Sequence, residues 1–213
     1  MSRTYTPIDR FIIEIDNALR TATGLAREAS RENPAKSEPD IVMDEEQRKH
    51  AAGLMRINHA GEVCAQALYE GQSLMARTRE VRRLLESAAS EEADHLAWCE
   101  QRLQELESRP SALNPVFYAL SYAMGAATGL LGDRVSLGFV EATEDQVCSH
   151  LEKHLADLPL EDERSREIVK RMHEDEARHG SAALEGGGVA FPQPVKKVMT
   201  AVSRIMTETS YRV

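Results

Sequence analysis

Two short stretches, Glu91-Glu92-Ala93-Asp94-His95 and Asp175-Glu176-Ala177-Arg178-His179, decide the fold of this chain. Both contain Glu-x-x-His, and only these two of the seven histidines have a glutamate three residues before them. An isolated glutamate precedes each pair, Glu62 by 30 residues and Glu141 by 35, counted to the paired glutamate. Four carboxylates and two imidazoles at such spacings are the ligand set of a dinuclear iron or manganese centre inside a four-helix bundle.

Helical geometry supports this interpretation, because residues three, four and seven apart share one face of a helix. Glu62, Glu92 and Glu176 each interrupt a largely apolar face, where an unpaired carboxylate costs several kcal/mol unless it is neutralised or bound to metal. Glu141 is the weakest of the four on this pattern, because its face also carries acidic residues. Spacing alone therefore leaves Glu144 open as an alternative to Glu141.

Other residues near the two motifs compete less well. Glu91 and Glu174 flank the paired glutamates, but only Glu92 and Glu176 stand three residues before a histidine on its face of the helix. Asp94 and Asp175 are either acceptors that orient the imidazoles or solvated surface acids. The remaining candidates, for which we predict hydrogen-bonding or surface roles and no metal, are His59, His150, His154 and His173.

The composition favours one all-helical domain. The chain has 213 residues, of which 42% are hydrophobic, 29% charged and only 5% aromatic, fewer aromatics than a β-sandwich needs. A net charge of −9 argues against nucleic acid as a partner. The three cysteines form no CxxC motif and indicate reduced thiols, and the first residues lack the features of a signal peptide.

Apolar periodicity and Pro/Gly positions, with the ligand pattern, predict an all-α four-helix bundle with additional N-terminal and C-terminal helices. Residues 1–40 are expected to form an N-terminal helix and a proline-containing linker, and residues 41–213 the di-iron domain. The expected helices cover about 6–30, 44–77, 79–108, 115–156 and 164–185, with a last short helix after residue 194.

Two segments point to a membrane surface. Residues 111–132 contain no charged side chain but include Pro115, and Glu141 must return to the core soon afterwards. We therefore expect a helix that lies against the bilayer or dips into it, the alternative being a fully buried core helix. The last helix has an apolar face and basic flanks, which favour an anionic membrane, with packing onto the bundle or a partner as the alternative.

Four stretches resemble one family, the demethoxyubiquinone hydroxylases of ubiquinone biosynthesis. They are the segment RINHAGEVCAQALYEGQ at 56–72, EEADHLAWC at 91–99, FVEATEDQV at 139–147 and MHEDEARH at 172–179. The likeness extends over roughly 44–213, and NHAGE followed by LYxGQ is more specific than a generic ferritin-like signature. One departure is Cys148, where some relatives carry a tyrosine, so no catalytic tyrosine is assigned.

The resemblance implies a ferritin-like, di-iron enzyme that uses O2 to hydroxylate a prenylated demethoxyubiquinol. It implies a peripheral membrane protein on the cytoplasmic face of the bacterial inner membrane, and partner proteins of ubiquinone biosynthesis, because eukaryotic members work with a lipid-binding partner. Electrons would come from the quinol itself or from NADH, although no GxGxxG motif is present. The six ligands of the two iron ions would be Glu62, Glu92, His95, Glu141, Glu176 and His179.

Two other functions use similar features. An iron-storage or peroxide-reducing protein shares the ligands but has no need of the uncharged helix. A metal-free helical adaptor would bind membranes or lipids without chemistry. The iron content of the purified protein separates all three.

Overall fold

The structure, a computed structural model, describes residues 20–21 and 29–213, and within these ranges every regular element is a helix. This confirms the all-α prediction. The helices are α2 (Glu45–Met75), α3 (Arg79–Glu105), α4 (Asn114–Leu130), α5 (Asp133–Asp157), α6 (Glu163–Glu185) and α7 (Gln193–Ser210). Most of the predicted N-terminal helix lies outside the described residues.

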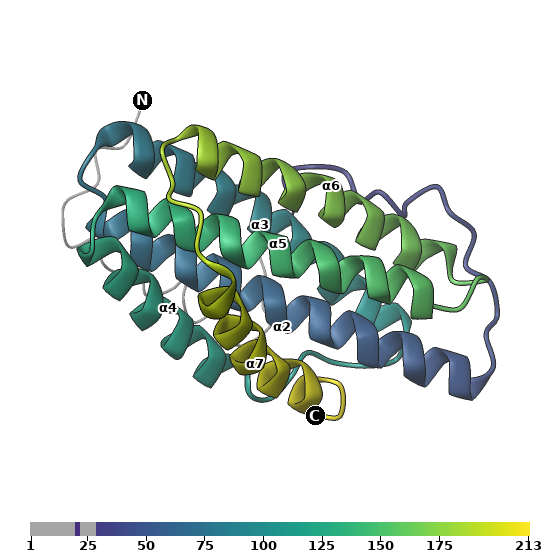
Figure 1. Cartoon of the computed structure of the whole chain (residues 1–213). Helices are drawn as coiled ribbons and strands as arrows, with labels where there is room; N and C mark the ends of the chain where they lie inside the picture. Colours follow the sequence, from purple (N-terminus) through teal and green to yellow (C-terminus); the bar gives the residue numbers. More distant parts are fainter. Residues whose placement is uncertain (1–19, 22–28) are drawn as a thin grey trace.

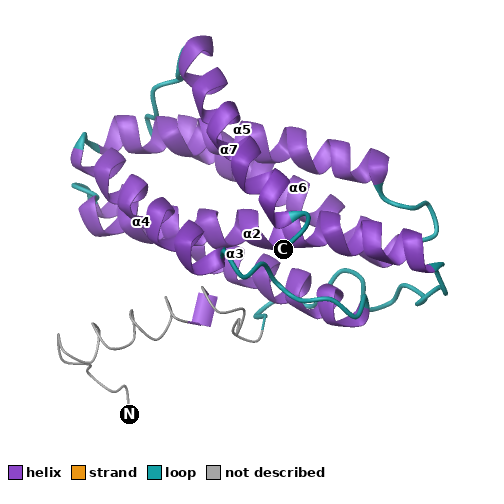
Figure 2. Cartoon of the chain, turned by 90° about the horizontal axis from the view of Figure 1, so that it is seen from below, coloured by secondary structure: helices purple, strands orange, loops and turns teal. Residues whose placement is uncertain are grey.

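Four of these helices form the bundle. Helix α2 packs along α3 and α5 along α6, and the two pairs meet through α3 with α6 and α2 with α5 (Figure 1). Helices α4 and α7 both pack against α2 from outside the bundle (Figures 1 and 2). The fold is therefore a helical bundle with extra helices, as predicted, and its core is the space between the two pairs.

Side-chain caps explain where the bundle helices begin. The Asp44 carboxylate accepts from the backbone N–H of Gln47, whose side chain accepts in return from the backbone of Asp44, a complete capping box for α2. Thr78 caps α3 and Asp162 caps α6 with a single hydrogen bond: each side chain accepts from the backbone N–H three residues further along the chain.

The prediction of one helix over 115–156 is wrong, because the chain breaks after Leu130. Gly132 has φ of +109°, which side-chain-bearing residues rarely adopt. Asp133 then accepts hydrogen bonds from the backbone N–H groups of Arg77 and Thr78, at 2.9 and 3.0 Å, and so ties the start of α5 to the start of α3. The break leaves α4 outside the bundle and returns α5 to the core.

Helix α4 lies unusually close to α2, because glycines face each other across the contact. A Cβ on Gly71 would lie 2.3 Å from the carbonyl oxygen of Tyr122, and one on Gly125 would lie 2.2 Å from that of Leu68. The outward side of α4 stays apolar, so the helix is neither fully buried nor polar on its free face. Its large exposed side chains, with those that follow it, are Val116, Leu120, Met124, Leu130 and Leu131.

Two buried polar pairs connect α2 to its neighbours. His154 on α5 lies 2.6 Å from the side-chain oxygen of Asn58, and Asn114 at the start of α4 lies 3.2 Å from Nδ1 of His59. Burial lowers the pKa of both His59 and His154 to about 4, so these rings are neutral hydrogen-bonding groups near pH 7.

The segment before α2 packs on the bundle. Ala35 is buried in the same hydrophobic cluster as Trp98, although residues 32–40 read as a polar linker in the sequence. The division of the chain into 1–40 and 41–213 stays a prediction. Across the residues that the structure covers, no helix is both long enough and apolar enough to span a bilayer.

The glycine contact between α2 and α4 gives a prediction about stability. Gly125→Ala should destabilise the protein by about 1–3 kcal/mol, because the new methyl group meets backbone that cannot move aside. Gly61→Ala is the matched control: a Cβ there has no neighbour within 4 Å, and alanine favours the helix by about 1 kcal/mol. Urea unfolding measures both, and equal effects of the two variants would contradict the packing argument.

Candidate metal centre

Six acidic and imidazole side chains meet in the middle of the bundle, and at most 6% of any of them is exposed. Helix α2 supplies one, α3 two, α5 one and α6 two, so each bundle helix contributes. The group consists of Glu62, Glu92, His95, Glu144, Glu176 and His179. Ligand atoms from four of them lie within 4.8 Å of one another: Glu62, Glu92, His95 and Glu176.

The two paired glutamates each face both histidines. Glu92 places one oxygen 3.1 Å from Nδ1 of His95 and the other 3.2 Å from Nδ1 of His179. Glu176 does the same, with 3.1 Å to each Nδ1. Glu62 completes the His95 side, with an oxygen 3.3 Å from its Nδ1. Two carboxylates that span two imidazoles are suited to bridging a pair of metal ions.

Glu144, the alternative that spacing left open, occupies the fourth carboxylate position, and Glu141 does not. Glu144 is 1% exposed and interacts with Glu176. Glu141 is turned away from the cluster and accepts a hydrogen bond of 2.8 Å from Lys196 of α7, which also contacts Asp145 at 3.1 Å. The reason is helical phase: Glu144 continues the buried face of Leu137, Val140 and Leu151.

Tyr69 is a member of the site to which the sequence assigned no role. It is fully buried on α2, seven residues after Glu62, and its hydroxyl donates to Oε1 of Glu144 at 2.5 Å. Its ring also packs edge-on against His179, with 6.2 Å between ring centroids. The available signal was its position on the same helix face as Glu62.

Burial and mutual repulsion give the cluster unusual protonation. Desolvation, with nearby carboxylates, raises the pKa of Glu62 and of Glu144 well above the usual range. Burial opposes ionisation of Glu92 too, but hydrogen bonds from Glu62 and the histidines outweigh it and hold its pKa low. Against burial, contacts with Glu176 and Glu92 raise the pKa of His179 to about 11. Without metal, protons thus compensate the carboxylates.

The residues present fit a pair of divalent cations. Three carboxylate oxygens of the cluster have no well-aligned hydrogen-bond donor within the described structure, although a histidine Nδ1 lies 3.2 Å from the first and 3.1 Å from the last: Glu92 Oε1, Glu144 Oε2 and Glu176 Oε1. Oxygen atoms without donors in a dry interior are costly, and a cation satisfies them. Four carboxylates also balance the charge of two divalent ions, with one imidazole for each ion.

Acidic residues just before the paired glutamates reach across to the opposite histidine. Asp175 on α6 accepts from Nε2 of His95 at 3.0 Å, whereas Glu91 on α3 lies 3.6 Å from Nε2 of His179. Despite burial, donors from His95, Arg31 and Arg178 hold the pKa of Asp175 well below its usual range. Of the two aspartates proposed to orient imidazoles, Asp175 contacts a ring, whereas Asp94 binds Ser30 and Arg31.

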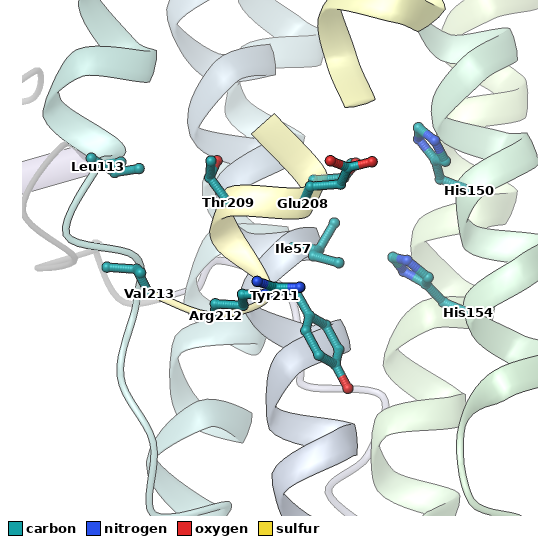
Figure 3. A pocket seen from close by; sticks show the side chains of 10 residues that line it. Ile57, Leu113, His150, His154, Glu208, Thr209, Tyr211, Arg212 and Val213 are labelled. Carbon is teal, nitrogen blue, oxygen red and sulfur yellow. The ribbon is translucent and has the colours of Figure 1, made fainter. Parts of the chain in front are cut away.

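A separate cavity of about 650 Å³ opens between α2, α5 and the C-terminal end of α7 (Figure 3). His150 and His154 line one side of it, and Glu208, Tyr211 and Arg212 line the other. None of the six cluster residues belongs to its lining. The cavity is therefore a feature distinct from the candidate metal centre.

Comparison with known proteins shows the family. Residues 49–210 match the model of a family described as "Ubiquinone biosynthesis protein COQ7". Three proteins named 3-demethoxyubiquinol 3-hydroxylase are similar to this chain. Those from Pseudomonas paraeruginosa, Azotobacter vinelandii and Stutzerimonas stutzeri are 58%, 56% and 55% identical to this chain. Each alignment covers 99% of this chain and 98% of the relative. The buried glutamate–histidine cluster is consistent with this match, which shows that the chain belongs to the COQ7 family of ubiquinone biosynthesis proteins.

Proposed function

We propose that this protein hydroxylates a prenylated demethoxyubiquinol with O2, as a 3-demethoxyubiquinol 3-hydroxylase, at two iron ions held in the bundle. The observation that carries the proposal is the convergence of four carboxylates and two imidazoles from all four bundle helices. The names of relatives at 55–58% identity over nearly the full chain support the reaction and its substrate.

For the ligand set we propose Glu144 in place of Glu141. Glu62 would hold metal beside His95 and Glu144 beside His179, while Glu92 and Glu176, which each lie close to both histidines, would contribute to both positions. With Glu144 in place of Glu141, the ligand spacing in the two helix pairs also becomes more alike. Glu144 precedes Glu176 by 32 residues, and Glu62 precedes Glu92 by 30.

When bound, the iron pair would supply the electrons and the open coordination positions that O2 activation needs. The protein residues hold the ions and keep water out. Tyr69 holds one oxygen of Glu144, which leaves the other free for metal. Buried apolar side chains surround the site from three helices: Leu85, Val140 and Met172.

We also propose that α4 and α7 rest on the membrane from which the lipophilic quinol enters. Both helices pack outside the bundle and both expose apolar side chains. On α7 these are Val195, Val198, Val202 and Ile205. Lys197 and Arg204 stand among them in the sequence, and cations beside an apolar face favour an anionic lipid surface.

The remaining details rest on the family resemblance. We propose the cytoplasmic face of the bacterial inner membrane as the location, and the quinol itself or NADH as the electron source. Partner proteins of ubiquinone biosynthesis belong to the same proposal.

The ligand assignment is tested by a pair of glutamine variants. Glu144→Gln should weaken Co(II) binding by more than about 10-fold, since even residues that only support ligands are worth that much. Glu141→Gln should leave binding unchanged and weaken only the partly buried ion pair with Lys196. Optical titration of metal-free protein measures both affinities. The opposite ranking would return Glu141 to the ligand set.

The reaction is tested with purified protein and a short-chain demethoxyubiquinol. We expect two irons per chain and a hydroxylated product whose new oxygen comes from labelled O2, with activity abolished in Glu92→Ala. Expression in a strain that lacks the hydroxylase should remove the accumulated demethoxy intermediate. Many irons per chain would favour storage instead. No metal, with normal behaviour of Glu92→Ala, would favour the adaptor.

Membrane binding is tested by placing a charge on the exposed apolar faces. Leu120→Glu and Val202→Glu should each reduce co-flotation with vesicles that contain anionic lipid, because a buried glutamate opposes insertion. Leu160→Glu, at a position 77% exposed between α5 and α6, is the matched control and should float as the wild type does. Equal flotation of all three variants would remove these helices from the proposal.

A further inference from the structure

We infer that Arg31, from the segment before the bundle, is a positioning residue for His95 and so for one of the two metal positions. The inference rests on the proposed metal centre. Arg31 precedes residue 49, where the family match begins, and it belongs to a segment that the sequence alone left without a role. It is joined to His95 through one shared carboxylate.

The guanidinium of Arg31 holds the two helices that carry the Glu-x-x-His motifs. Its Nε donates to Asp94 on α3 at 2.6 Å, and its Nη1 donates to Asp175 on α6 at 2.7 Å. It also lies over the ring of Trp98, 4.9 Å from the centroid, where a cation is attracted to the aromatic face. The planar fork of arginine suits such a bridge, which a single ammonium group cannot make.

The oxygen that Arg31 holds is the one that His95 uses. Asp175 Oδ2 accepts from Arg31 Nη1 and also from His95 Nε2, at 3.0 Å. A hydrogen bond from Nε2 to a carboxylate keeps the proton on that nitrogen and turns Nδ1 toward Glu62, Glu92 and Glu176. Arg31 thus fixes the position of the acceptor that orients the ring.

His179 has weaker support from the corresponding residue. Its Nε2 makes no hydrogen bond within the described structure, and its nearest acid, Glu91, is 3.6 Å away. Glu91 is instead engaged by Arg178, and the contacts that Arg31 makes with it are longer than its hydrogen bond to Asp175: 3.6 Å to the carboxylate and 3.4 Å to the backbone carbonyl. Loss of Arg31 should therefore affect the metal position beside His95 more than the one beside His179.

Metal titration of the full-length protein tests this asymmetry. Arg31→Gln should weaken one of the two Co(II)-binding steps by about 10-fold, the lower end for residues that support a ligand, and leave the other step unchanged. Asn33→Ala is the matched control: it removes another contact of the same segment, to Gln101, without touching Asp175. If Asn33→Ala weakens binding equally, anchoring of the segment explains the effect and the inference fails.

A double-variant cycle tests the route through Asp175. Asp175→Asn alone should weaken the same step, and Arg31→Gln should add nothing in that background, because the two residues act through one hydrogen bond to His95. Additive losses would show that Arg31 acts by another route. If Arg31→Gln does not fold, Arg31→Lys replaces it in the test. A smaller loss of Co(II) affinity at the same binding step is then expected, because lysine keeps the positive charge but lacks the planar guanidinium that reaches both aspartates.

Nitrogen-15 NMR of the histidine rings in metal-free protein separates this inference from the proposed function. The Nε2 proton of His95 should be visible and slow to exchange in the wild type and in Asn33→Ala, and lost or shifted in Arg31→Gln. A His95 signal that is unchanged in Arg31→Gln overturns the inference. Wild-type protein that binds no metal overturns the proposed function alone, because the ring contact exists without metal.

Discussion

The structure depends on the cost of burying four carboxylates and two imidazoles in the centre of a helical bundle. Ionised acids in such a place repel one another and lack water, so each needs a proton, a hydrogen-bond donor or a cation. Protons on Glu62 and Glu144 and charged histidines satisfy part of this need, and three carboxylate oxygens of the cluster still lack a well-aligned donor. The bundle helices contribute little charge of opposite sign to the cluster, so metal ions are the natural compensation.

The arrangement is approximately two-fold. The α2–α3 pair supplies Glu62 with the first Glu-x-x-His motif, and the α5–α6 pair supplies Glu144 with the second. Asp175 and Glu91, one residue before each paired glutamate, reach toward the histidine of the opposite pair. The symmetry ends there, because Arg31 from the segment before α2 makes a hydrogen bond of 2.7 Å to Asp175 but comes no closer than 3.6 Å to the carboxylate of Glu91. The two proposed metal positions are therefore unequally supported.

Helices α4 and α7, which lie outside the bundle, are attached to it by different contacts. Glycine contacts press α4 onto α2, while its far side remains apolar and exposed. Lys196 fastens the start of α7 to α5, and near its end Tyr211 hydrogen-bonds His50 of α2 at 2.8 Å. The apolar face between these two anchors is left uncovered by the described chain. This uncovered apolar surface is the observation behind the proposed contact with a membrane.

The sequence by itself determined the all-α bundle, five of the six cluster residues and the family, because Glu-x-x-His on an apolar helix face is a local pattern that few other structures explain. Spacing left both Glu141 and Glu144 open, and the family resemblance favoured Glu141. Both lie within one turn, so which of them joins the cluster depends on which face of α5 meets the other helices. The sequence also missed the break at Gly132, because a single glycine does not by itself end a helical pattern and its φ depends on the turn. Only tertiary structure decided these points, and only it brought Tyr69 to Glu144 and Arg31 to Asp175, because contacts between distant segments leave no periodic trace in the chain.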